Sequence, residues 1–329
     1  MTCIDTCGSL GVYTAMAVEN SDIVNCNPAT FDENSERYEI LNESVRYTDN
    51  LLGGNGLTGT IDSIGNHLRH GARVVAGSFT MEVGPHDLTN WLPRIFGNPA
   101  AGTTFATDET FDMQPFDIML KRDQGTVTYR RCSVASATFT STASIGGQSQ
   151  VMRMTLQILG HEEHDTTWPD PGPTLPTSDR LYWLLGDGKL EMTPDGGSQT
   201  EYYFDSFSLR IDNNLVPKLR NFLKVTCIQT NGRQIRLRVR TPYTVSSHSN
   251  LYINDFQGSG LLSFVGSMAN HNNDEVPATY STVMTLPDLR QTRRTPATQG
   301  REEIPLTLDM EAYRTSSAEP ITVVNSHPA

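Results

Sequence analysis

The chain has 329 residues, of which 37% are hydrophobic and 19% are charged, and its formal net charge is −12. An acidic surface repels nucleic acid within a Debye length of about 8 Å at physiological salt, which argues against a general affinity for DNA. No apolar run approaches the roughly 18 residues that a membrane-spanning helix needs, so we expect no membrane association.

The first residues show neither the basic region nor the apolar region of a secretion signal. The five cysteines are scattered and odd in number, so reduced thiols in a cytosolic setting are expected rather than a disulfide framework. Cys3 and Cys7 have no second Cys or His pair nearby, and so they do not predict zinc binding. Residues 1–40 are mostly irregular, apart from a strand expected over 10–18.

Residues 44–97 combine four features. A short strand (44–48) precedes a long loop rich in Gly and Asn (49–71), and long loops of this kind are commonly functional. The alternation over 73–83 then predicts a half-buried strand, with a β-bulge at Gly77 where the alternation slips.

A short helix is expected over 86–96. Pro85 suits the first helical position, Pro93 shortens the helix and Gly97 is suited to end it. So short a helix needs a sheet to pack on. Its apolar residues lie at helical spacing on one face: Leu88, Trp91, Leu92 and Ile95.

Residues 111–161 predict further strands, separated by turns at 123–125 and 145–147. The segment 166–179 (TTWPDPGPTLPTSD) contains four prolines in 14 residues. Proline fixes φ and removes a hydrogen-bond donor, so we expect an extended, semi-rigid linker here. This places a first unit at 1–165 and a second unit at 180–329.

The second half repeats the order of the first. Residues 208–216 (SLRIDNNLV) resemble 44–52 (SVRYTDNLL), and 232–245 resemble 71–84 as an alternating strand after a glycine. Residues 300–315 resemble 147–162 in the same way. The chain is therefore interpreted as an internal duplication of one β-unit.

Motifs that would carry chemistry are weak. The run Gly54–Gly59 is formally G-x-G-x-x-G, but it lacks the buried strand before it and the helix after it that a dinucleotide site needs. The cluster at 161–165 (HEEHD) does not have the H-E-x-x-H spacing, and we interpret it as a solvated strand end. Trp91 and Trp183 are expected in the core rather than at a ligand. No catalytic, cofactor-binding or metal-binding residue is predicted, and we expect no enzyme.

A short arginine-rich stretch is interpreted as an exposed loop that pairs with acidic neighbours rather than as a site for nucleic acid. Its members are Arg290, Arg293, Arg294 and Arg301.

The order of elements in 44–97, together with SFSLRIDNNLVP in the second half, resembles the tail tube (major tail) proteins of long-tailed bacteriophages, in particular those with two fused tube units. The resemblance covers residues 10–315. It implies a mainly β fold with two tandem sandwich or barrel units, each with a short flanking helix and a long loop that contacts the next ring. After Val245 the second unit departs from the pattern, because SSHSNLYINDF is a poor helix.

The resemblance also implies a role. The chain would polymerise as stacked rings into the tail tube of the virion, after assembly in the host cytoplasm, and double-stranded DNA would pass through the lumen without specific binding. If relatives with one unit form rings of six, a chain with two units would close with three copies. The implied partners are further copies of the chain and the tail terminator, tape measure and baseplate or tip proteins.

The resemblance assigns contact roles to two loops and core roles to the helix. The loops would span 49–70 and 212–231, and the helix core is the set Leu88, Trp91, Leu92 and Ile95. The contact residues of the first loop would be Asp49, Asn50, Gly53, Gly54, Asn55, Gly56, Gly59, Asp62 and Asn66. Those of the second would be Asp212, Asn213, Asn214, Lys218 and Arg220.

Two other interpretations stay open. One is a different structural part of a virion, such as a tail terminator, a contractile-type inner tube or a decoration protein. The other is a carbohydrate-binding β-sandwich or an enzyme of unknown type.

Overall fold

The computed structural model describes most of the chain. The ranges that it describes are 15–21, 29–52, 69–97, 102–107, 113–122, 125–143, 150–174, 181–219, 225–243, 251, 256–268, 278–292 and 305–326.

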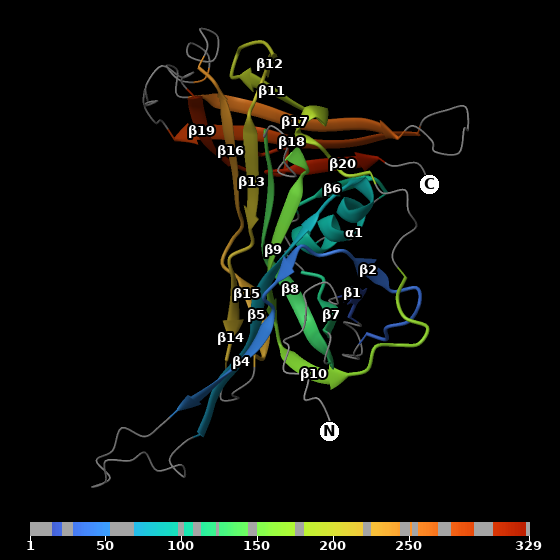
Figure 1. Ribbon diagram of the computed structural model, residues 1–329. Coiled ribbons are helices and arrows are strands. Elements are labelled where there is room, and N and C mark those ends of the chain that lie inside the picture. The colour runs from blue at the N-terminus through green and yellow to red at the C-terminus, as the bar shows by residue number, and fades with distance from the viewer. Residues whose placement is uncertain are drawn as a thin grey trace.

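The fold is mainly β, with one large antiparallel sheet of 18 strands, a separate two-stranded sheet and one α-helix within the described ranges (Figure 1). No helix described is long and apolar enough to cross a bilayer. The first ten elements are β1 (Ala15–Asn20), β2 (Glu36–Tyr38), β3 (Asn42–Glu43), β4 (Arg46–Leu52), β5 (Arg69–Glu82), α1 (Pro85–Phe96), β6 (Thr104–Ala106), β7 (Phe116–Arg122), β8 (Gly125–Thr142) and β9 (Arg153–Gly160).

The remaining elements begin with a strand that folds back on the first half. They are β10 (Glu162–Thr166), the 3-10 turn η4 (Leu185–Asp187), β11 (Gly188–Pro194), β12 (Thr200–Tyr202), β13 (Ser206–Asp212), β14 (Leu215–Lys218), β15 (Cys227–Thr230), β16 (Gln234–Pro242), β17 (Gln257–Met268), β18 (Ala278–Thr292), β19 (Pro305–Ala312) and β20 (Thr322–Ser326).

Strand β5 runs between β4 and β9, and it corrects one prediction. The bulge expected at Gly77 is wrong, because β5 pairs in continuous register through Gly77 with β9. A Cβ at Gly77 would lie 2.4 Å from the backbone oxygen of Ser44, so glycine is needed for the close approach of that chain segment. The irregular register lies in β8 instead, between Val134 and Ser136.

Helix α1 forms where the apolar spacing placed it. The carboxylate of Asp87 accepts a hydrogen bond from the Gly84 N–H (3.1 Å), and Gly97 ends the helix with a left-handed φ of 80°. Near the end of α1, the buried guanidinium of Arg94 donates to Glu36 Oε2 (2.7 Å) and packs over Trp91 and Phe116. The four predicted core side chains are each at most 1% exposed: Leu88, Trp91, Leu92 and Ile95.

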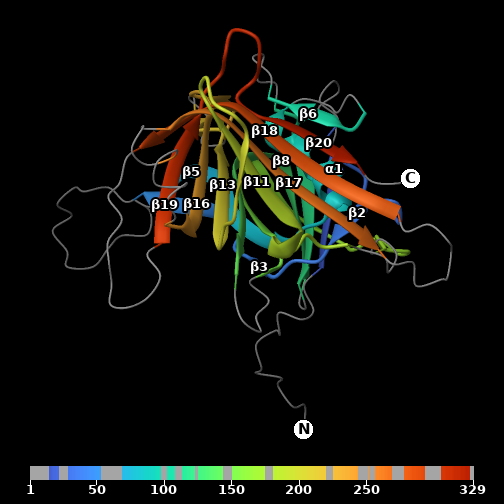
Figure 2. The same cartoon turned by 90° about the horizontal axis from the view of Figure 1, so that it is seen from above.

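The two halves share one sheet, and a division into two tandem units is not evident. Strand β13 of the second half pairs with β8 of the first, from Ser206 opposite Thr142 to Asp212 opposite Ser136. Buried apolar residues from both halves form a single core cluster that includes Trp183 and Phe264. In Figure 2 the strands of the second half cross over those of the first, beside α1.

The described part of the proline-rich segment folds back on the first half. The Lys121 ammonium lies 5.7 Å from the centre of the Trp168 ring, and Arg37 Nη1 donates to the Pro173 oxygen. The second flanking helix, expected after residue 245, falls largely outside the described residues.

The packing of Trp91 generates the first prediction. Its ring lies 5.3–5.6 Å from the rings of Tyr38, Phe79 and Phe116. Trp91→Ala should lower the free energy of unfolding by about 3–5 kcal/mol, because it leaves a large cavity between the helix and the sheet. Urea denaturation followed by circular dichroism measures this. Tyr203→Ala is the matched control, since Tyr203 is 83% exposed, and equal losses in the two variants would contradict the assignment.

Candidate assembly surfaces

The first arm is the hairpin formed by β4 and the start of β5. The strands pair from Arg46 opposite Ala76 to Leu52 opposite Arg69, and Arg73 forms an ion pair with Asp49 (3.3 Å). The arm thus extends the main sheet beyond its core before the chain enters residues 53–68, which lie outside the described ranges.

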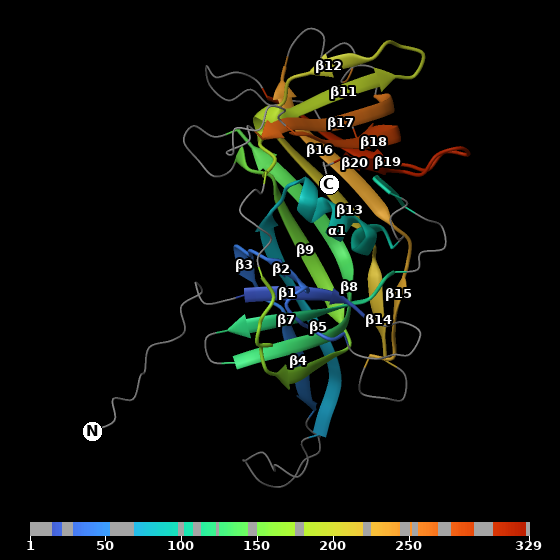
Figure 3. The same cartoon turned by 90° about the vertical axis from the view of Figure 1, so that its right-hand side faces the viewer.

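The second arm is the separate sheet of β14 and β15, and it is built differently. Asn214 and Gly232 both have positive φ, of 45° and 102°, and the Asn214 amide donates to the Gly232 oxygen (2.9 Å). These two residues turn the chain out of β13 and back into β16, which starts a new two-stranded sheet. Figures 1 and 3 both show the two arms extending toward the same end of the molecule, away from β11 and β12.

The C-terminal end of α1 is held by the second half of the chain. The fully buried amide of Asn213 donates to the backbone oxygens of Ile95 and Val134, each at 2.9 Å. Arg233 donates to Asn213 Oδ1 (2.8 Å) and to the Phe96 oxygen (2.7 Å). Carbonyls in the last turn of a helix have no partner within the helix, so these side chains satisfy buried groups that would otherwise be costly.

A second buried network holds the other end of α1. Asn325 donates to the Pro85 oxygen (2.7 Å) and to Thr89 Oγ1 (2.8 Å), while its own oxygen accepts from the hydroxyl of Thr282 (2.6 Å). The Trp183 indole N–H in turn donates to Thr282 (3.1 Å). The helix of the first half is therefore fixed at both ends by residues of the second.

The outward edge of the chain at Val45 is bonded to side chains rather than to a strand. The Val45 N–H donates to Glu43 Oε2 (3.1 Å), and its oxygen accepts from Arg122 Nη2 (3.1 Å) and the Tyr129 hydroxyl (2.9 Å). Arg122 also pairs with both carboxylate oxygens of Glu43, at 2.9 and 3.1 Å. Burial raises the pKa of Tyr129 to about 12 although Arg122 opposes the rise, so the hydroxyl keeps its proton at neutral pH.

The sheet face opposite the core carries the outward-pointing arginines of β16. Along β16, Ile235, Leu237 and Val239 are buried, whereas the alternating arginines point outward. Outward arginines of this region pair with nearby carboxylates: Arg238 with Asp309 (3.4 Å), Arg240 with Asp205 (3.9 Å) and Arg210 with Asp212 (2.7 Å).

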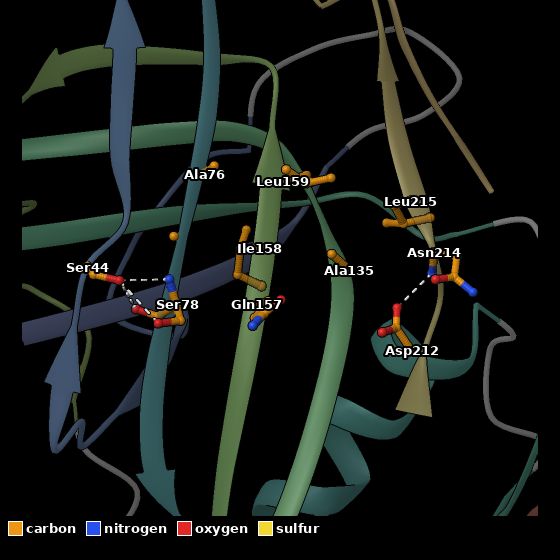
Figure 4. Close-up of a pocket in the computed structure, with 11 residues that line it drawn as sticks. Ser44, Ala76, Ser78, Ala135, Gln157, Ile158, Leu159, Asp212, Asn214 and Leu215 are labelled. Atoms are coloured by element: carbon orange, nitrogen blue, oxygen red, sulfur yellow. Dashed lines mark hydrogen bonds between the residues drawn. The ribbon is translucent and has the colours of Figure 1, made fainter. Parts of the chain in front are cut away.

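A shallow hollow of about 520 Å³ lies on this face, between the base of the second arm and strands β5 and β9 (Figure 4). Its lining includes Ser44, Ser78, Gln157 and Asp212, with Ser44 bonded to Ser78 and Asp212 bonded to the backbone N–H of Asn214. This set provides neither a nucleophile with its base nor a group of metal ligands.

The structure describes some of the residues in the weak chemical motifs. No cluster of three metal-ligating side chains occurs among the residues that the structure describes. In the HEEHD segment, His164 Nε2 lies 3.2 Å from Glu162 Oε2 on β10, and burial together with Arg131 lowers the pKa of His161. Arg290 pairs with Asp288 (3.0 Å) on β18. The glycine run 54–59 and the other three arginines of the basic stretch lie outside the described ranges.

A comparison with protein families decides the identity of the chain. A family model described as phage tail tube protein matches residues 28–312. The chain belongs to the phage tail tube proteins. A search of curated proteins finds no match. As a tail tube protein it is a structural, non-enzymatic component of the virion tail, and the family implies polymerisation with further copies of itself.

The predicted contact residues of this tail tube protein fall in three groups. Asp212, Asn214 and Lys218 lie at the base or on the first strand of the second arm, and Asp49 lies on the first arm. Asn213 lies between them but is buried beneath α1. Only the backbone of Asn50 is described, and the others lie outside the described ranges: Gly53, Gly54, Asn55, Gly56, Gly59, Asp62, Asn66 and Arg220.

Sequence reasoning did not find the polar residues that hold the surfaces of the tail tube protein in place. Asn213 stands in a run of Asp and Asn that is typical of a turn, and Arg233 and Asn325 lie far from α1 in sequence. Glu43 and Arg122, which form a hydrogen bond, are 79 positions apart in the sequence. No spacing rule connects such residues, because only the tertiary fold brings them together.

The Asn213 network generates the second prediction. Asn213→Ala should lower the free energy of unfolding by about 3 kcal/mol, since it leaves the carbonyls of Ile95 and Val134 without their donor. Asn214→Gly is the control, because its side chain is exposed and glycine accepts its positive φ; its loss should stay within about 0.5 kcal/mol. Chemical denaturation compares the two, and a loss in Asn213→Ala no greater than in the control would refute the role of the network.

Proposed function

We propose that the chain builds the tail tube as stacked rings of three copies, in which each copy supplies two versions of one β-unit. The rings would form the channel through which DNA is ejected into the host. The observation that carries this proposal is a repeated order of strand pairing along the chain.

The repeat is seen by following the hydrogen-bonded neighbours. In the first half the order is β2–β1–β7–β8–β9–β5–β4, and in the second it is β12–β11–β17–β18–β19–β16–β13. The next strand along the chain also returns equivalently, since β10 pairs with β8 and β20 pairs with β18. This agreement supports a duplicated unit, with its boundary near 166–179.

The pairing between β8 and β13 suggests how neighbouring copies would pair in a ring. β13 stands last in the pairing order of the second repeat, and it covers part of the edge of β8 in the first. Its counterpart β4 has one strand neighbour within the described ranges, β5. The strand equivalent to β8 is β18, which is described as far as Thr292. An open edge that pairs with a different edge on the next copy is heterologous and closes into a ring when the rotation allows.

The polar face of the sheet is suited to line the channel. The opposite face packs in the core, and on the polar face Arg238 and Arg240 of β16 pair with carboxylates. Paired arginines attract phosphate less than free ones would, and the chain as a whole is acidic, so DNA would slide without long-lived contacts.

The two arms would reach the next ring, since both extend toward one end of the molecule. The end rings of such a tube would meet the tail terminator and the baseplate or tip proteins, and the tape measure protein would occupy the channel. Another structural part of the virion is the alternative function. The hollow at the base of the second arm is shallow, so it does not favour a carbohydrate-binding sandwich.

Ring stoichiometry is the third prediction. Purified protein should form tubes or rings in negative-stain micrographs, and class averages of end views should show six lobes in three alternating pairs. Mass photometry of single rings should give three times the chain mass of 36.4 kDa. Rings that contain six chains would contradict the proposal.

Removal of the first loop is the fourth prediction. Deleting residues 53–65 should abolish ring stacking while rings still form, because the edges that close a ring lie outside this loop. Deleting residues 271–276, in the connection between β17 and β18, is the control and should leave stacking intact. Circular dichroism verifies the β-fold of both variants, and tubes formed by the first deletion would show that this loop is not the contact.

A further inference from the structure

We propose that Glu43, Arg122 and Tyr129 form a cap that closes the assembly edge of the free chain and is displaced when a strand of a second copy pairs there. The inference rests on the proposed ring, because it concerns the edge by which one copy would join the next.

Backbone geometry places Val45 on the outward edge. The Ser44 N–H donates to the Ser78 oxygen (2.7 Å), and the Ser78 N–H donates to the Ser44 hydroxyl (3.0 Å), so Ser44 is bonded toward β5. Successive residues of a strand direct their N–H and C=O groups to opposite sides. Val45 lies between β3 and β4, and its N–H and C=O bond to Glu43, Arg122 and Tyr129 rather than to β5, on the side where we infer that a further strand would add.

The repeat shows what this edge does when it is paired. With Ser44 aligned to Ser208, Val45 corresponds to Leu209, which lies opposite Phe139 of β8. Backbone bonds from Ala143 to Asp205 (2.6 Å) and from Asn213 to Ala135 (2.8 Å) show that the odd-numbered residues of β13 face β8. Leu209 thus uses its backbone groups to join the two repeats, whereas Val45 gives its groups to side chains.

The cap is chemically complete. Glu43 takes the place of a strand carbonyl by accepting from the Val45 N–H, and Arg122 and Tyr129 take the place of a strand amide by donating to its oxygen. Glu43 and Arg122 also hold one another through two hydrogen bonds. A free strand edge invites uncontrolled pairing, and side chains that occupy its hydrogen-bonding groups prevent it.

The position of the cap explains how it would open. The Glu43 side chain is 18% exposed and that of Arg122 is 37% exposed, so water can solvate both groups once they leave Val45. Tyr129 and Val45 are each 1% exposed, so the two charged side chains are the ones that would move aside. An arriving strand would supply a carbonyl and an amide in exchange, and the number of backbone hydrogen bonds would be conserved. Assembly would then need an edge that is already aligned, which favours growth on an existing ring over the start of a new one.

The test is the protein concentration at which tubes first appear, measured by light scattering and electron microscopy on the full chain. Arg122→Met keeps the aliphatic stem and removes the donor, and it should lower this concentration by about tenfold, the effect of one lost charge-assisted hydrogen bond. Glu43→Gln should lower it less, because the amide oxygen still accepts from Val45. Arg238→Met, which breaks an arginine–carboxylate pair on the sheet face, is the matched control and should change nothing.

The outcomes separate the cap from the ring. A wild-type chain that forms rings, together with an Arg122→Met variant whose threshold is unchanged or higher, overturns the cap and leaves the proposed function standing. Failure of every variant and of the wild type to form rings overturns both. If Arg122→Met does not fold by circular dichroism, Tyr129→Phe decides the matter in the same way, since it removes only the hydroxyl that donates to Val45.

Discussion

The backbone pairing between β8 and β13 is the constraint on which the rest of the structure depends. It joins the two halves of the chain edge to edge, so that a buried apolar cluster can extend across both. Because strand pairing fixes register as well as contact, it also sets where Asn213 and Arg233 meet the end of α1. Without this pairing, the helix would have buried carbonyls with no donor.

The helix and the sheet are therefore interdependent. Residues 85–96 have an apolar face but only three turns, which is marginal for a helix in water. Its burial gives it stability, while the second half satisfies its polar groups at both ends through Asn213 and Asn325. The first half thus does not complete its own core, which is consistent with one sheet and one core cluster that include residues of both halves.

The sequence supports the elements more clearly than the contacts between them. The i, i+3, i+4, i+7 spacing of Leu88, Trp91, Leu92 and Ile95 was sufficient for α1, because helical periodicity is local. The same kind of local reasoning failed at Gly77, where a slip in alternation suggested a bulge. Glycine is needed there because the backbone of Ser44 approaches too closely for a Cβ. The need for glycine at this position comes from a chain segment more than thirty residues away, so a local sequence pattern cannot reveal it.

At the candidate surfaces, too, local features were easier to predict from the sequence than contacts between distant residues. The glycine and asparagine content predicts two contact loops, and the similarity of SVRYTDNLL and SLRIDNNLV predicts a duplication; both stay predictions. The sequence did not show that Asn213 is buried or that Val45 is bonded by Glu43 and Arg122. Polar residues that read as turn or surface residues acquire such roles only from partners supplied by other strands.

The positive φ angles of Asn214 and Gly232 have a consequence for how the proposed rings of three would stack. These two residues lead the second arm into a separate two-stranded sheet, whereas the strands of the first arm belong to the main sheet. Alternate contacts around a ring would then differ in shape, so that successive rings fit only at rotations of a third of a turn rather than a sixth. A tube of the proposed kind would have fewer equivalent rotational settings, and a twist applied at one end would be transmitted along it with less rotation between neighbouring rings.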